Sequence, residues 1–281
     1  MAYFEIALRN SIHREMSLFY SVRAATNAAA AAGAGTVAAA TIGAAAASSS
    51  FHWYDAIAAQ LKNETKKKIF NVRHKRGTPP IPIVPPPSPD EIVSRVSFGF
   101  WPAILSSINS AHADKLFPKI FPGHPLNANP LDWKNSQKCK KALAYIFELN
   151  DLRNRIAHHE PLWRFAEVKD TSVYPNIVLA AQSINQAETI TRFQRLQRLF
   201  DAGIGALNQD LLVDIQQSSV LRKLRLLLSE RGLNRYRKRT HFAVAGHLTP
   251  ANFRKQYSLL SKRNQPVRIG RSGIYGVFDP E

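Results

Sequence analysis

The sequence predicts an all-α protein. Apolar residues recur every three or four positions in several segments, whereas no strand-like alternation of useful length precedes residue 240. Hydrophobic residues make up 45% of the 281 residues, enough to bury a sizeable core. We divide the chain into a helical domain at residues 1–230 and a basic, mostly irregular tail at residues 231–281.

The first part of the chain is expected to alternate helices with irregular segments. A helix is predicted over residues 2–20, where four apolar residues recur at helical spacing: Leu8, Ile12, Met16 and Phe19. The Ala-rich residues 24–50 show no amphipathic stripe and are interpreted as a low-complexity insertion. Residues 52–75 are helical in pattern and end very basic. A Pro-rich linker at residues 77–87 should be extended and stiff.

Further helices follow the linker. Ser88-Pro89-Asp90-Glu91 predicts a helix start, with Ser88 as the cap and Glu91 completing a capping box. Gly99 and Pro102 suggest a bend near Trp101. Residues 112–135 are expected to be irregular, because prolines and glycines interrupt them. The clearest helix runs from about Ser136 to His159, where Pro161 ends it, and two more are predicted at residues 185–200 and 209–230.

The charge of the chain points to a polyanionic partner. The formal net charge is +18, from 38 Lys+Arg against 20 Asp+Glu. Basic side chains that meet phosphates release condensed counterions, so nucleic acid is the first candidate partner and an anionic membrane surface the second.

The cysteine count and the N-terminal sequence indicate the cellular compartment in which we expect the protein. Cys139 is the one cysteine, so the chain forms no internal disulfide, and we expect a reducing cytoplasm. Charged residues interrupt any signal-like run near the N-terminus. The uncharged residues 24–47 are mostly Ala, Gly and Thr, and we expect no transmembrane helix there.

The helix predicted at residues 136–159 has two contrasting faces. An apolar face is expected to be buried and contains Ala142, Tyr145, Leu149, Leu152 and Ile156. A polar face contains Asn150, Arg153, Asn154, Ala157 and His158, where the small Ala157 leaves room for a ligand.

The polar face combines the groups that phosphodiester cleavage needs. Arg153 offers a forked cation for the phosphate, His158 titrates near neutrality, and Asn154 lies one turn before His158. An attack by the RNA's own 2′-hydroxyl requires no metal or other cofactor, and the sequence holds no convincing metal-ligand cluster. Arg155 and His159 are secondary candidates. An ordinary solvated helix face carries the same residue types, so that interpretation stays open.

One copy of this helix presents an incomplete site. Arg153 and His158 are ~140° apart around a regular helix, at ~100° per residue. A second copy of the chain is therefore expected across the cleft, or a second half-site from the N-terminal helix formed by Glu5, Arg9, Asn10 and His13. The alternative is structural: Glu5 and Arg9 at i and i+4 pair and hold their helix.

Four ordered segments resemble one family. Residues 152–161 (Leu-Arg-Asn-Arg-Ile-Ala-His-His-Glu-Pro) closely resemble the signature of the Abi-like (abortive infection) proteins of the HEPN superfamily, and the other matching segments lie at residues 4–13, 52–55 and 96–101. The resemblance implies a HEPN-like helical bundle and a metal-independent endoribonuclease, active as a homodimer in phage defence or as a toxin. The catalytic residues would be Arg153, Asn154 and His158.

Other readings remain open. The basic clusters form plausible RNA-tracking surfaces or solvated charged faces, and comprise Lys66, Lys67, Lys68, Arg73, Arg235, Arg237, Lys238 and Arg239. A second function class is a non-catalytic RNA- or DNA-binding sensor or regulator in defence. A third is a toxin held silent by a regulatory partner protein, and a guide or structured RNA is a further candidate partner.

Overall fold

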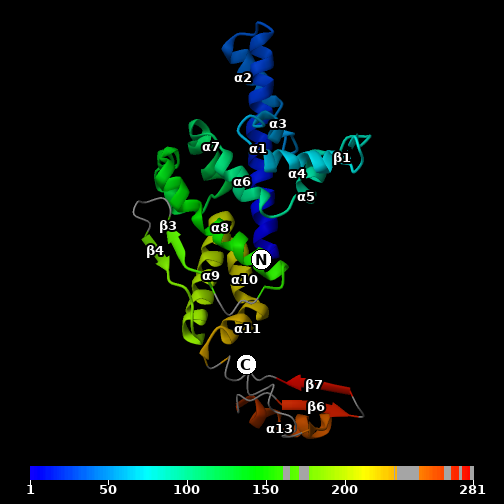
Figure 1. Ribbon diagram of the computed structural model, residues 1–281, viewed down its shortest axis with the longest axis vertical. Helices are drawn as coiled ribbons and strands as arrows, with labels where there is room; N and C mark the ends of the chain where they lie inside the picture. Colours follow the sequence, from blue (N-terminus) through cyan, green and yellow to red (C-terminus); the bar gives the residue numbers. More distant parts are fainter. Residues whose placement is uncertain are drawn as a thin grey trace. The chain divides into compact units, whose positions relative to one another are not determined.

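The computed structural model describes residues 1–160, 165–170, 177–230, 232, 247–262, 267–271 and 274–278 (Figure 1). Helices make up most of these residues, which confirms an all-α class at the coarse level. Contacts divide the chain between Gln216 and Gln217, whereas the sequence division was at residue 230. The two units are described separately below.

Helices and short strands alternate in the first unit. Its elements are α1 (Ala2–Ala31), α2 (Thr36–Ala45), α3 (Trp53–Ala56), α4 (Asn63–Arg73), β1 (His74–Lys75), β2 (Ile81–Pro82), α5 (Pro89–Arg95), α6 (Phe100–Ser107), α7 (Ser110–Ile120), the 3-10 helices η1 (Pro125–Ala128) and η2 (Pro130–Lys134), α8 (Ser136–Ala157), β3 (Val168–Asp170), β4 (Ile177–Ala180), α9 (Gln186–Leu207) and α10 (Gln209–Gln217).

The core of the first unit is built around α1. Its side chains Phe4, Leu8, Ile12 and Met16 have no exposed surface, and they lie one turn apart on a single face. This face packs against α3, α6, α7 and α9. Burying each such side chain stabilises the fold by roughly 1.5–3 kcal/mol, so the N-terminal stripe anchors the bundle. The predicted helix at residues 2–20 is confirmed, although it continues to Ala31.

The Ala-rich segment, whose order the sequence left open, forms a helical hairpin. It completes α1 and forms α2, which packs against α1. Gly43 lies at the closest approach, since an added Cβ would come within 1.9 Å of Thr26 Oγ1 and 2.9 Å of the Val22 carbonyl oxygen. Small residues thus replace an amphipathic stripe as the packing device, which explains why no stripe was visible in the sequence.

Two segments around the linker also differ from expectation. The helical pattern at residues 52–75 is broken between α3 and α4. The Pro-rich linker is extended, and part of it returns as β2 to pair antiparallel with β1, with His74 opposite Pro82. The Ile83 backbone N–H donates to the Arg73 carbonyl at 2.9 Å, so the linker is fastened to the end of α4.

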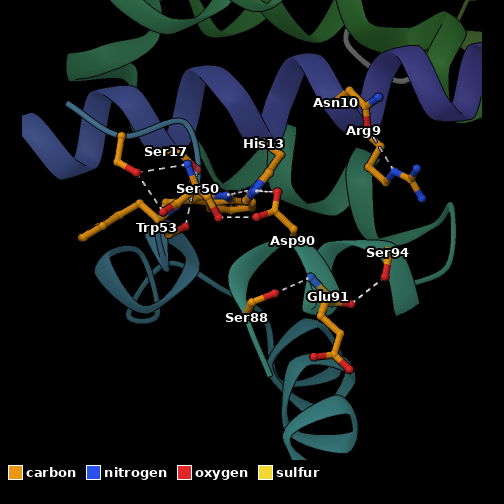
Figure 2. Close-up of polar contacts among 12 residues, drawn as sticks. Arg9, Asn10, His13, Ser17, Ser50, Trp53, Ser88, Asp90, Glu91 and Ser94 are labelled. Atoms are coloured by element: carbon orange, nitrogen blue, oxygen red, sulfur yellow. Dashed lines mark hydrogen bonds and ion pairs between the residues drawn. The ribbon is translucent and has the colours of Figure 1, made fainter. Parts of the chain in front are cut away.

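The helix start at Ser88 is confirmed, but the capping box is half formed. The Glu91 backbone N–H donates to Ser88 Oγ at 3.2 Å (Figure 2). The Glu91 carboxylate accepts from Arg95 one turn later. The expected bend near Trp101 is instead a break between α5 and α6 at residues 96–99. Trp101 and Phe98 are buried in the core.

The expectation of irregular structure at residues 112–135 was wrong. Most of this segment is helical, in α7, η1 and η2. Ala113, Leu116, Phe117 and Ile120 form a buried stripe along α7 that outweighs the proline at position 118. Phe117 stacks on Trp133 of η2 with ring centroids 4.8 Å apart, so burial of aromatic surface holds the segment in place.

The second half of the first unit contains strands that the sequence did not predict. β3 and β4 pair antiparallel between α8 and α9, with Asp170 opposite Ile177. The helix predicted at residues 185–200 is α9 and continues to Leu207. Arg195 of α9 makes a two-pronged ion pair with Glu148 of α8, with Nη2 and Oε1 2.8 Å apart, which fixes the register of these two helices.

The second unit contains α11 (Ser219–Leu227), β5 (His247–Leu248), α13 (Pro250–Lys262), β6 (Val267–Arg271) and β7 (Ile274–Phe278). The helix predicted at residues 209–230 is thus divided into α10 and α11. β5 pairs parallel with β6, and β6 pairs antiparallel with β7. The described part of the tail is therefore a small sheet with a helix, not irregular chain.

Candidate functional site

The predicted catalytic segment lies at the C-terminal end of α8. The helix ends in a Schellman motif: the His159 N–H donates to the Ile156 carbonyl at 3.2 Å and the Glu160 N–H to the Arg155 carbonyl at 2.8 Å. His159 occupies the left-handed position of this motif, with φ of 55°. Glycine is usual at that position, so the backbone of His159 is strained. Pro161, which was expected to end the helix, lies outside the described residues.

The buried face of α8 differs from the predicted one. Leu143, Ile146 and Leu149 are the buried residues of this helix, whereas Ile156 is 46% exposed. The expectation that Ile156 points into the core was therefore wrong. Residues 156–160, at and just beyond the end of α8, are all exposed. The predicted catalytic end of the helix is thus open to solvent.

Arg153 links α8 to the N-terminal helix. Its Nε lies 3.8 Å from Glu5 Oε2, and both side chains are partly exposed. Asn154 is half-buried and His158 is exposed. Across the described residues, no hydrogen bond or ion pair is found between the side chains of Arg153 and His158. One copy of the chain therefore holds these two groups at one helix end without joining them.

Arg155, a secondary catalytic candidate, contacts Glu160 and Phe165. Its Nε lies 3.5 Å from Glu160 Oε2, and its guanidinium carbon lies 5.0 Å from the centre of the Phe165 ring. Arg192 of α9 approaches the same ring at 5.5 Å. These two cations hold the chain that leaves α8 against α9.

Arg192 is a buried cation that the sequence reasoning missed. Its Nη2 donates to the Ala166 carbonyl at 3.2 Å, and burial lowers the pKa of its guanidinium. A signal was available in the sequence, because Arg192 lies four residues before the buried Leu196 and so shares its face of α9.

The residues proposed as a second half-site lie in three different settings, and Figure 2 shows Arg9, Asn10 and His13. Glu5 reaches Arg153, as described above. Arg9 and Asn10 contact each other at 3.4 Å on the surface of α1. His13 is buried and contacts Trp53 and Asp90, so the structure does not bring it to α8.

The contacts of His13 fix its tautomer. Trp53 Nε1 can only donate, and it donates to His13 Nδ1 at 2.9 Å. His13 Nε2 therefore carries the proton, which it donates to Asp90 Oδ1 at 3.2 Å, while Asp90 also accepts from the Ser50 hydroxyl. This network ties α1 to the segment before α3 and to the start of α5 (Figure 2). It favours the structural interpretation of the Arg9–His13 stripe.

The basic residues of α4 point in two directions. Lys66, Lys67 and Arg73 line a groove beside α3. Lys68 lies on another face: its Nζ would be 3.7 Å from a Cβ added at Gly99, and Asn150 Oδ1 of α8 would be 3.5 Å from the same point. Lys68 thus lies beside the polar face of α8, which sequence spacing alone did not reveal.

Several expectations fall outside the described residues. The basic residues 235, 237, 238 and 239 belong to this part, as do Trp163 and Arg164. Within the described residues, no group of three or more His, Cys, Asp or Glu side chains is arranged to hold a metal ion. None of the helices that the structure describes is both long and apolar enough to cross a membrane.

We predict that acid weakens the fold through His13. Burial is the main cause that lowers the pKa of His13 below 6.5 in the folded protein, against the opposing effect of Asp90, while Arg9 and His52 lower it slightly further. The unfolded chain therefore binds the proton more tightly, and the free energy of unfolding should decrease as the pH falls from about 7 to 5. Urea denaturation at stepped pH should show a smaller decrease for His13→Gln than for the wild type. Equal pH dependence in both proteins would contradict this role.

We also predict that glycine at position 159 stabilises the protein. His159→Gly removes the strain of a side chain at φ of 55° and should raise the free energy of unfolding by about 1 kcal/mol. Chemical denaturation measures the change, and His158→Gly is the matched control, because His158 has φ of −92° and should gain nothing. Destabilisation by His159→Gly would show that its imidazole holds the end of α8.

No protein-family model matches this chain, and no characterised protein or solved structure matches it either. The likeness to the Abi-like proteins therefore depends on the four ordered segments alone. Any activity inferred from it is a proposal, which the geometry at the end of α8 has to support.

Proposed function

We propose that this protein is a metal-independent endoribonuclease of the HEPN class. The observation that carries the proposal is the exposed C-terminal end of α8, where the guanidinium of Arg153 and the imidazole of His158 face solvent within one helical turn and a half. The charge of +18 supplies the attraction for a polyanion. The resemblance of the four ordered segments to the Abi-like proteins indicates the class of reaction.

The proposed chemistry uses the RNA's own 2′-hydroxyl. His158 accepts the proton of this hydroxyl or donates a proton to the leaving 5′-oxygen, the two proton transfers that this cleavage requires. The O2′–P bond forms as the P–O5′ bond breaks, which leaves a 2′,3′-cyclic phosphate and a 5′-hydroxyl. Arg153 neutralises the charge that develops on the phosphate oxygens, and Asn154 orients the phosphate or His158.

Glu5 pairs with Arg153 while no RNA is bound. A partly exposed ion pair at 3.8 Å contributes little stability, about 0–1 kcal/mol, so a phosphate can compete for the guanidinium. The carboxylate positions Arg153 while the site is empty. This gives the N-terminal stripe a role at the site through Glu5, whereas His13 acts in the core.

A homodimer completes the proposed site. Arg153 and His158 do not contact each other in one copy, and a second copy across the cleft would bring the His158 of one chain to the phosphate held by Arg153 of the other. We propose phage defence by abortive infection, or toxin action, as the biological setting. A regulatory partner protein or a guide or structured RNA would then set when the enzyme acts.

The second candidate function is non-catalytic binding of RNA or DNA by a sensor or regulator. The groove beside α4 favours it, because basic and aromatic side chains meet there away from His158. This candidate requires salt-dependent binding without cleavage, and binding that survives the loss of His158.

The decisive prediction concerns cleavage in the presence of a chelator. Wild-type protein should cut end-labelled RNA in excess EDTA, and His158→Ala or Arg153→Ala should lower the rate by 100-fold or more, since each removes a group that acts in the transition state. Thr41→Ala, at an exposed position of α2, is the control and should cut normally.

Two outcomes would count against the proposal. Cleavage that stops in EDTA would exclude the metal-independent mechanism. Cleavage that continues unchanged in His158→Ala would exclude the residue assignment, and tight binding without any cleavage would favour the sensor.

A further inference from the structure

A groove between α3 and α4 has the character of a ligand site that the proposed reaction does not use. It has a volume of about 460 Å³ and is lined by Tyr54, Lys66, Lys67, Phe70, Arg73 and His74, with apolar side chains at its base. Its aromatic and basic side chains come from elements separated in sequence by the break after α3.

Helix geometry explains why these side chains meet. Lys66, Lys67, Phe70 and Arg73 recur at spacings of three and four along α4 and therefore share one face, and His74 follows directly after the helix ends. Thr65 and Ile69, on the adjoining side of α4, are its buried residues, and Ile69 also lines the groove. Phe70 consequently stands on a basic face, and 44% of its surface is exposed.

Phe70 is held flat by His74. The two rings are stacked with centroids 3.8 Å apart and planes inclined by 17°. The His74 Nδ1 lies 2.9 Å from the Phe70 carbonyl oxygen, and because a carbonyl only accepts, Nδ1 carries a proton. The imidazole is thereby fixed as one side of a preformed aromatic platform, and ordering it costs nothing further on binding.

The positive charge available in the groove comes from two lysines. Arg73 is engaged in a bidentate pair with Asp55, at 2.9 and 2.5 Å, and lies over the ring of Tyr54 at 5.2 Å. By contrast, Lys66 and Lys67 are exposed, and within the part of the chain that the structure describes no carboxylate forms an ion pair with either. Arg73, which the sequence placed in a basic cluster that tracks RNA or forms a solvated face, is paired here with Asp55 and lies against Tyr54.

We propose that this groove binds single-stranded RNA, with one base stacked on the Phe70–His74 platform and the adjoining phosphates on Lys66 and Lys67. The inference rests on the proposal that RNA is the substrate and names the surface that grips it. An exposed aromatic ring beside flexible cations matches the way proteins hold unpaired strands, because every base has a flat face and every nucleotide a phosphate. Bases in a duplex are covered by their neighbours and do not offer that face.

The test separates stacking from charge. It uses a fluorescein-labelled single-stranded RNA of twelve or so nucleotides and the full chain carrying His158→Ala, so that the RNA stays intact. Phe70→Leu keeps an apolar side chain of similar bulk but removes the ring, and should weaken binding about tenfold. Phe70→Tyr retains the ring and should bind like the parent. Thermal unfolding of all variants confirms that they are folded.

The lysines are tested by salt dependence. Lys66→Ser combined with Lys67→Ser should reduce the slope of log affinity against log salt by about 1.4, which corresponds to two phosphate contacts on a single strand. The matched control is Lys140→Ser with Lys141→Ser, which removes the same charge from exposed positions of α8 and should leave the slope nearly unchanged.

Three outcomes would overturn the proposal: equal affinity for RNA in Phe70→Leu and its parent, equal loss from the two double-lysine variants, or binding to anionic lipid vesicles that responds to Phe70→Leu while RNA binding does not. Failure here is distinct from failure of the nuclease. If the wild type cuts RNA in EDTA and Phe70→Leu does not change binding, only the proposed binding role of the groove is contradicted. If binding depends on the Phe70 ring but no cleavage occurs, only the proposed nuclease activity is contradicted.

Discussion

The burial of one face of α1 is the constraint on which the rest of the first unit depends. Phe4, Leu8, Ile12 and Met16 are removed from water entirely, and four other helices pack against this face. Because one face of α1 is fully buried, the polar side chains on its other faces are held at fixed positions along the helix axis. Glu5 meets the end of α8 near the start of α1, and His13 meets Trp53 two turns later.

The same helix therefore serves two kinds of polar contact. The Glu5 pair is partly exposed and weak enough for a phosphate to displace, while the His13 network is buried and satisfied on both ring nitrogens. In the proposed reaction Arg153 exchanges Glu5 for a phosphate, and a weak, exposed ion pair allows this exchange. Buried, fully paired groups suit a tie that sets the fold. Residue spacing alone places Glu5 and His13 on one stripe as equivalent positions. Their different burial and pairing distinguish them.

The sequence predicted those elements in which apolar periodicity dominates. The buried stripe of α1, the start of α5 at Ser88 and the course of α8 follow directly from residue spacing. It failed where another kind of packing takes over: Gly43 lets two Ala-rich helices approach without a stripe, and burial around Phe117 overrides the proline in α7. The antiparallel pairing of β6 with β7 was also missed, although the sequence between these two runs contains the turn signal Ser-Gly.

The candidate site was predictable in composition but not in geometry. Arg153, Asn154 and His158 follow from the polar face of the helix, yet the Schellman ending that exposes His158 depends on the backbone of His159. The pairing of Arg153 with Glu5 and the approach of Lys68 to Asn150 join segments distant in sequence, and such contacts exist only once the core has folded. Phe70 gave a misleading signal, since an apolar residue on a helix predicts burial and here it is half exposed.

The ends of the RNA products test the central claim most directly. RNA cut by the wild-type protein in EDTA should carry a 2′,3′-cyclic phosphate and a 5′-hydroxyl, so the downstream fragment should accept a phosphate from polynucleotide kinase without prior phosphatase treatment. These ends can arise only when the neighbouring 2′-hydroxyl attacks the phosphorus, as the arrangement of His158 and Arg153 requires. A 5′-phosphate on the downstream fragment would show that water is the nucleophile and would contradict the account.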